Sequence, residues 1–134
     1  MMKARIDMVG VLTSQFAAML SFYRDVLGFK VLLEMDGFAE FENEGVRFAL
    51  STNAVMLGIT EHKSYTKPRQ GHGFELAFRS TSPQEVDTDY AALIEKGAIP
   101  IKGPADMPWG QRTAFFADPD DNIHEIFADL RRGA

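Results

Sequence analysis

The chain has 134 residues, 46% of them hydrophobic and 25% charged, which is ordinary for a globular protein built as one domain or as two small half-domains. With 14 Lys and Arg against 19 Asp and Glu, its net charge is -5, which argues against non-specific binding to nucleic acid or to anionic membranes. Cysteine is absent, which excludes thiol nucleophiles, disulfides, iron–sulfur clusters and thiolate zinc sites.

No apolar run in the sequence approaches the roughly 20 residues that are needed to cross a bilayer. The first residues, MMKARIDMVGVLTSQ, lack the long apolar segment of a secretory signal. We therefore expect a cytoplasmic protein with no membrane partner.

The first part of the chain predicts a strand, a helix and three further strands. Residues 4–13 alternate loosely and indicate the first strand. Residues 16–27 carry apolar side chains at the i, i+3, i+4 and i+7 spacing of a helix with one buried stripe, and Gly28 ends that helix. The three strands that follow are expected at residues 29–35, 38–42 and 46–51.

Residues 53–72 interrupt this pattern with a mixed composition that includes Lys67-Pro68 and Gly71. We interpret this segment as a linker that holds at most a short strand around Val55–Ile59.

The pattern then restarts. Residues 74–78 predict a strand, and Ser82-Pro83-Gln84-Glu85 is a capping box with proline at the first helical position. The helix that it begins ends at Gly97. A strand at 98–101, a loop at 102–111 and a hairpin of strands at 112–117 and 123–127, closed by DPDDN, complete the chain.

The order β-α-β-β-β is therefore written twice, which indicates an internal duplication. The two helix-ending glycines are about 69 residues apart, and Met8 and Glu75, in the two opening strands, are about 67 apart. We expect one domain, residues 4–130, made of two modules at about 4–52 and 73–130.

Two motifs stand out within this order of elements: FYRDVLGF at 22–29, in the first helix, and WGQRTAFFADPDDNIHEI at 109–126, in the closing hairpin. They resemble the first-helix signature and the closing hairpin of the vicinal oxygen chelate superfamily, the glyoxalase/bleomycin resistance/dioxygenase group. The resemblance implies an α+β fold in which the curved sheets of two βαβββ modules form a cleft. It also implies a homodimer whose cleft is often completed across chains.

One residue of the hairpin departs from the family pattern, because Asp121 stands where the family has glycine. Aspartate tolerates a positive φ better than most residues, so we expect the turn to be kept.

The resemblance also implies four positions for the ligands of a divalent metal, usually His, Glu, His and Glu. By motif they fall on Met8, near Phe48, on Glu75 and on Glu125. Two carboxylates without imidazole suit zinc, nickel or iron poorly, although magnesium could use them together with water. We therefore expect no metal cofactor, with a divalent metal on Glu75 and Glu125 as the open alternative.

Other residues could line the cleft. Strand alternation places Glu75 on one face with Ala77 and Arg79, and Glu125 on one face with Ile123 and Phe127. Two close carboxylates could share a proton and serve as a base or as an anchor for a cation. Met8, Phe48, Trp109 and Arg112 are further ligand-binding candidates. Trp109 could equally be a packing residue of its loop, and a surface charge is the favoured interpretation of Arg112.

Three functions remain open. The first is a protein that binds a small apolar or cationic molecule in a dimer cleft without a complete metal site. The second is a metal-dependent lyase or isomerase of the glyoxalase type, or a dioxygenase, with Glu125 as metal ligand or catalytic base. The third is a scaffold whose cleft has lost its function.

Overall fold

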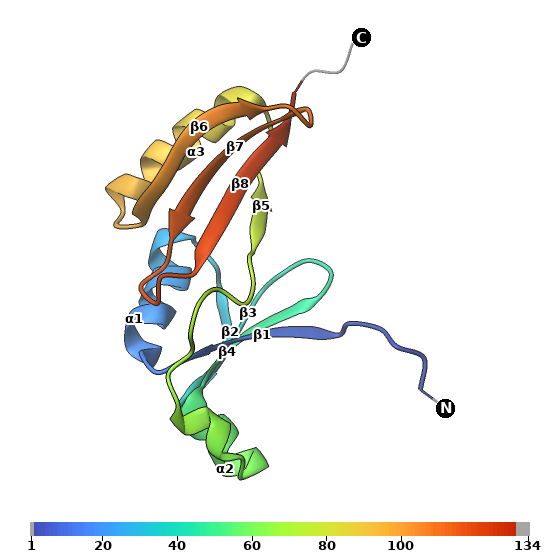
Figure 1. Cartoon of the computed structure of the whole chain (residues 1–134), viewed down its shortest axis with the longest axis vertical. Helices are drawn as coiled ribbons and strands as arrows, with labels where there is room; N and C mark the ends of the chain where they lie inside the picture. The colour runs from blue at the N-terminus through green and yellow to red at the C-terminus, as the bar shows by residue number, and fades with distance from the viewer. Residues whose placement is uncertain (1, 131–134) are drawn as a thin grey trace. The chain divides into compact units, whose positions relative to one another are not determined.

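The computed structural model describes residues 2–130, and the chain divides between Gln70 and Gly71 into two compact units, here unit 1 and unit 2. Each unit contains a four-stranded sheet with its own helices (Figure 1). The predicted α+β fold with two βαβββ modules is confirmed. Among residues 2–130, no helix has the length and apolar content needed to span a bilayer.

Unit 1 follows the predicted order of elements. Its helix α1 continues directly into a π-helical turn, η1, and Gly28 ends this segment with a φ of 83°. The strands lie in the order β1-β4-β3-β2, with β1 parallel to β4 and the other pairs antiparallel. The elements are β1 (Met8–Thr13), α1 (Phe16–Ser21), η1 (Phe22–Val26), β2 (Val31–Met35), β3 (Phe38–Phe41) and β4 (Arg47–Thr52).

An aromatic cluster forms the core of unit 1. Tyr23 is fully buried, and its ring lies 6.0 Å from Phe41 and 5.6 Å from Phe48, measured between centroids. Phe29 joins the cluster at 5.2 Å from Phe48. Because Tyr23 belongs to the helical segment, this side of the sheet is the helix side, and we call the opposite side the open face.

Residues 53–72 are more regular than expected. They contain the helix α2 (Asn53–Thr60) and the 3-10 turn η2 (Lys63–Thr66), so the predicted strand at Val55–Ile59 is wrong. Thr52 ends β4 and caps α2 at once, since its Oγ1 accepts a hydrogen bond of 3.0 Å from the Val55 amide. A short apolar run is ambiguous between strand and helix, and the cap decides it here.

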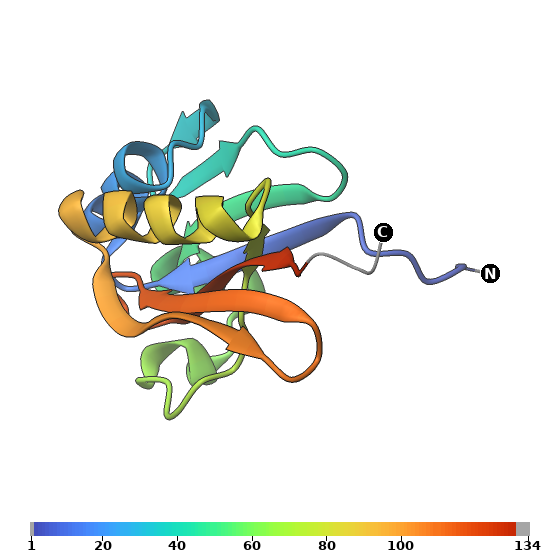
Figure 2. The same cartoon turned by 90° about the horizontal axis from the view of Figure 1, so that it is seen from above.

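Unit 2 repeats the topology, with strand order β5-β8-β7-β6 and β5 parallel to β8. The helix α3 lies along one face of the sheet (Figures 1 and 2). Its start is as predicted, because Ser82 Oγ accepts a hydrogen bond of 3.1 Å from the Glu85 amide. The elements are β5 (Ala77–Arg79), α3 (Pro83–Glu95), β6 (Ile99–Met107), β7 (Gln111–Ala117) and β8 (Ile123–Asp129).

Two strands of unit 2 differ in length from the prediction. The loop expected at 102–111 is wrong for its first half, because β6 continues to Met107. As an edge strand with two register shifts, β6 accommodates Pro100 and Pro104. In contrast, β5 begins only at Ala77, so residues 74–76 precede the ladder instead of belonging to it.

Gly37, in the turn between β2 and β3, allows a test of how α2 is held. Its φ is 78°, and an added Cβ would lie 2.9 Å from Val55 Cγ2 and 3.0 Å from Thr52 Oγ1, the capping atom. Gly28 has a similar φ of 83° with nothing within 4 Å, which makes it a matched control. We expect Gly28→Ala to cost about 1–2 kcal/mol of backbone strain.

Gly37→Ala should cost more than Gly28→Ala, since it adds a steric conflict at the α2 cap. Urea unfolding of the two variants measures the difference. Equal losses would show that the packing of α2 on this turn contributes nothing to stability.

Candidate functional site

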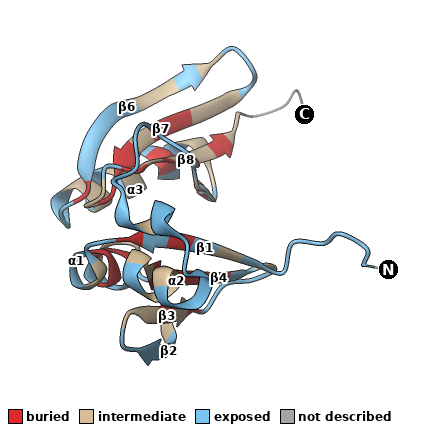
Figure 3. Cartoon of the chain, turned by 60° about the horizontal axis from the view of Figure 1, so that its bottom comes forward, coloured by how far each residue is buried: buried red, intermediate tan, exposed pale blue. Residues whose placement is uncertain are grey.

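The open face of the unit-2 sheet presents most of the polar groups that the sequence singles out. Along β8, His124, Ile126 and Ala128 are buried, while the residues between them are half-buried (Figure 3). The buried set faces α3, so the alternate set lies on the open face. We define the unit-2 open face by Glu75, Ala77, Arg79, Gln111, Thr113, Phe115, Ile123, Glu125, Phe127 and Asp129.

Glu125 lies at the centre of this face, paired with Ala77 on β5 and with Phe115 on β7. Burial raises the pKa of the Glu125 carboxyl, and the negative charge of Glu75 raises it further. Within residues 2–130, neither glutamate side chain has a hydrogen-bond or ion-pair partner. The centre of the face therefore carries two neighbouring carboxylates that have no counter-charge among residues 2–130.

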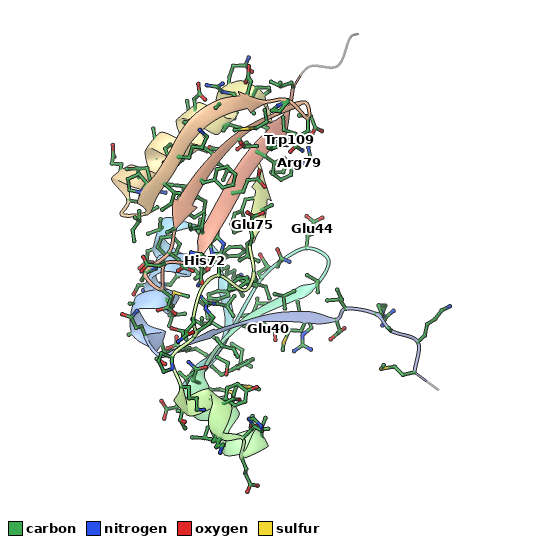
Figure 4. All side chains as sticks on the ribbon, in the orientation of Figure 1. Glu40, Glu44, His72, Glu75, Arg79 and Trp109 are labelled. Atoms are coloured by element: carbon green, nitrogen blue, oxygen red, sulfur yellow. The ribbon has the colours of Figure 1, made fainter. Side chains whose placement is uncertain are left out.

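A chain of hydrogen bonds connects the polar side chains at one end of the face. Arg79 donates to Asp129 at 3.0 Å, and Gln111 donates to the other oxygen of Asp129 at 3.2 Å. The Trp109 indole N–H donates to Gln111 at 3.1 Å, and the Arg79 guanidinium stands 4.7 Å from the centre of the Phe127 ring. Figure 4 shows Arg79 and Trp109 at the same end of unit 2. Asp129 thus balances the charge of Arg79.

Trp109 is itself the most accessible aromatic group of this region. Its side chain is 63% exposed, and its indole N–H is held by Gln111. The ring is therefore oriented by one polar contact while its faces stay open to a stacking partner.

Thr113 adds an unpaired hydroxyl to the two unpaired carboxylates. It pairs with Phe127 across β7 and β8 and is fully buried, and among the described residues its hydroxyl has no hydrogen-bond partner. Leaving a buried hydroxyl unpaired costs about 1–3 kcal/mol. The face thus lacks partners for a hydroxyl as well as for two carboxylates.

Arg112 does not lie on this face. Its guanidinium donates to Asp87 of α3 at 2.8 Å and to Asp106 of β6 at 2.9 Å, which places it on the helix side. These two carboxylates raise the pKa of Arg112. Its position on β7 alternates with that of Gln111 and Thr113, and Arg112 connects α3 to the sheet.

The unit-1 positions also require a correction. Met8 lies on the open face of unit 1 and is 42% exposed, but Phe48 is only 5% exposed and packs in the aromatic core on the other side. The strand register identifies the residue equivalent to Glu125. Glu125 pairs with Ala77, whose counterpart in the first module is Gly10, and Gly10 pairs with Ala49. The position is thus Ala49, one residue from the prediction.

Glu40 was not among the predicted site residues. It pairs with Ala49 on the neighbouring strand, which places its side chain on the open face of unit 1. Arg47 donates to Glu40 at 3.2 Å and to Asp7 at 3.1 Å, so this carboxylate, unlike Glu125, has a cationic partner. Glu40 therefore does not leave an unbalanced charge.

The resemblance implies ligand positions at Met8 and, by the register above, Ala49 in unit 1, and at Glu75 and Glu125 in unit 2. They supply two carboxylates, a weak thioether and a methyl group. No cluster of three or more His, Asp or Glu side chains that could hold a metal ion occurs within residues 2–130. Neither the unit-1 pair nor the unit-2 pair fits a transition metal, which favours imidazole or thiolate ligands.

The signals for the missed residues were present in the sequence. Asp129 is four residues after Glu125, so strict alternation beyond the predicted strand end would place it on the same face. Gln111 stands directly opposite Asp129 once the hairpin register is known. The expectation for Asp121 is confirmed, since its φ is 63° in an intact turn.

Comparison with known proteins agrees with this architecture. The profile of the Glyoxalase/Bleomycin resistance protein/Dioxygenase superfamily matches residues 5–126, and the chain belongs to this superfamily. It is 32% identical over 127 residues to the uncharacterized protein YraH of Bacillus subtilis (strain 168), an alignment that covers 91% of this chain and 96% of that protein.

Two solved structures are also similar. A glyoxalase/bleomycin resistance protein/dioxygenase from Nocardioides shares 31% identity with a TM-score of 0.86, covering 99% of this chain and 88% of that one. TnmS3, an antibiotic binding protein from Streptomyces sp. CB03234, shares 26% identity with a TM-score of 0.66, covering 96% and 98%.

The raised pKa of Glu125 has a consequence for stability. Because its pKa is higher in the folded chain than in the unfolded chain, the folded state binds more protons between the two values. Stability therefore falls as the pH rises through that window. We expect Glu125→Gln to raise the Tm at neutral pH and to leave it unchanged at a pH below the ordinary glutamate pKa.

Glu75→Gln should lower the pKa of Glu125 toward its ordinary range without restoring it fully, since burial is the larger cause. Carboxyl carbon shifts followed by NMR against pH measure both effects. A Glu125 titration that is the same with and without Glu75 would show that the two carboxylates do not interact.

Proposed function

We propose that the protein binds a small apolar or cationic molecule on the unit-2 open face, without a complete metal site. The observation that carries this proposal is the half-buried Glu125 carboxylate beside Glu75, which has no partner in the part of the chain that the structure describes. A desolvated anion is costly unless it is paired, and a bound cation supplies the missing charge.

The surroundings of the two carboxylates support an organic cation. Phe115 on β7 lies opposite Glu125, and Phe127 on β8 lies opposite Thr113. The face of an aromatic ring attracts a positive charge. Arg79 is the cation within the unit-2 open face, and its pairing with Asp129 keeps it from neutralising the glutamates. TnmS3, an antibiotic binding protein of similar structure, supports small-molecule binding on this fold.

We further propose that the protein acts as a homodimer whose ligand cleft is completed by the second chain. Support comes from the superfamily resemblance and from the incomplete donor set of the four ligand positions. Light scattering coupled to size-exclusion chromatography should give a mass near twice 15.0 kDa. A monomer that still binds ligand would contradict this part of the proposal.

The main experiment compares three probes of one size: benzylammonium, benzyl alcohol and benzoate. Wild-type protein should bind benzylammonium most strongly and benzoate least, as measured by calorimetry at neutral pH. Glu125→Gln and Glu75→Gln should each weaken benzylammonium binding by about tenfold, the effect of losing a charge-assisted contact of 1–2 kcal/mol. Glu95→Gln, an exposed glutamate at the end of α3, is the matched control.

Elemental analysis of the purified protein accompanies the binding measurements. Substoichiometric metal is expected in wild type and in Glu125→Gln alike. Stoichiometric transition metal that Glu125→Gln removes, or equal affinity for the cation and the neutral probe in all variants, contradicts the proposal.

A metal-dependent lyase or isomerase of the glyoxalase type is the second candidate, because a raised carboxyl pKa is what a general base needs. In that case Glu125 is the base or a ligand of a bound metal. A panel of α-ketoaldehyde–thiol adducts, assayed after reconstitution with divalent metals, tests it. Turnover that requires metal and is lost in Glu125→Gln would replace the binding function.

A further inference from the structure

We propose that His124, buried beneath the unit-2 open face, is a positioning residue that holds the Glu75 carboxylate beside Glu125. This inference rests on the proposed function, because it concerns the same pair of glutamates. Glu125 belongs to the strand β8. Glu75 lies outside the strand ladder, since β5 begins only at Ala77. Regular strand pairing therefore fixes the backbone around Glu75 only in part.

Leu76, the residue next to Glu75, is held from β8 by both of its backbone groups. Its carbonyl accepts a hydrogen bond of 2.9 Å from the Glu125 amide. Its amide donates to the His124 ring at Nδ1, 3.2 Å away. A side chain thus takes the place of the carbonyl that a longer strand ladder would supply.

The same contact fixes the tautomer of His124. A backbone N–H can only donate, so Nδ1 must be the acceptor and the ring proton is on Nε2. Nε2 lies 3.2 Å from Asp118 Oδ2, a carboxylate that accepts this proton in a hydrogen bond. Both His124 and Asp118 are fully buried.

Asp118 is itself held rigidly by the hairpin turn. Its Oδ1 accepts from the amides of Asp120 at 2.9 Å and Asn122 at 3.0 Å, and its Oδ2 also accepts from the Asn122 side-chain amide at 2.8 Å. The chain of contacts therefore runs from the turn through Asp118 and the His124 ring to the Leu76 amide.

The packing of the ring leaves it little freedom. Phe74 and Phe116 lie 5.8 Å from the His124 ring centroid, and Phe78 lies 6.3 Å away. Phe74 and Phe78 alternate with Glu75 along the chain and therefore lie on the other side of the segment. They anchor its helix side, while Glu75 points to the open face. His124 is not in contact with the ligand in this account and acts through Glu75.

Two substitutions separate the functions of the two ring nitrogens. In His124→Asn, the amide oxygen takes the position of Nδ1 and still accepts from Leu76, but the contact to Asp118 is lost. In His124→Gln, the amide nitrogen takes the position of Nε2 and still donates to Asp118, but the acceptor for Leu76 is lost. Both variants remove the ring and its packing, so they are matched in that cost.

His124→Gln should speed amide exchange at Leu76 about tenfold, the effect of losing one hydrogen bond, and should weaken benzylammonium binding. His124→Asn should retain both the slow exchange and the affinity. In a Glu75→Gln background, His124→Gln should cause no further loss of affinity. Equal losses in both histidine variants, in proportion to their global stability, would show a structural role only and overturn the proposal.

Two measurements need no ligand. In wild type, NMR should detect scalar coupling through the hydrogen bond between the Leu76 amide nitrogen and His124 Nδ1, which decides the contact even if both variants fail to fold. The Glu125 carboxyl titration should shift downward in His124→Gln and stay in place in His124→Asn. An absent coupling or an Nδ1-protonated ring overturns the positioning role, whereas failure of wild type to bind benzylammonium, with both results present, overturns only the proposed function.

Discussion

The arrangement of unit 2 depends on the alternation of buried and outward-facing side chains along β8. This strand lies between β5 and β7 and carries Glu125. His124, Ile126 and Ala128 are buried against the helix side, and this fixes which residues face outward. Glu125 and Asp129 then share the open face because a strand has a period of two. A shift of one residue would bury both carboxylates under α3, so the packing of the core and the chemistry of the face are specified together.

The two carboxylates of β8 differ in whether a neighbouring group neutralises their charge. Asp129 is neutralised by Arg79 and hydrogen-bonded to Gln111, and it orders the end of the face near Trp109. Glu125 receives no such partner from the described residues and is also partly desolvated. An unpaired and partly desolvated carboxylate lowers stability, and we interpret this loss as a cost of the proposed ligand binding. On the open face of unit 1, Glu40 is paired with Arg47 and therefore carries no comparable cost in stability.

Much of the fold could be predicted from the sequence because its signals are local and repeated. The capping box at Ser82 and the glycines at positions 28 and 97, which end the two predicted helices, mark boundaries, and the repeated order of elements carries the duplication. The site was predicted less well, because a face depends on register. The step from Phe48 to Ala49 reverses the side of the sheet, and only the pairing of β1 with β4 reveals it. The helix α2 was missed because a short apolar run has no decisive period.

The central claim is that a cation completes the Glu75–Glu125 pair, and its most direct test is the proton balance of binding. Calorimetry of benzylammonium binding in buffers of different ionisation enthalpy measures how many protons are released. Between the ordinary glutamate pKa and the raised pKa of Glu125, wild type should release protons on binding, because the bound cation favours the ionised carboxylate. Glu125→Gln should release none. Cation binding to wild type without proton release anywhere in that window would contradict the account.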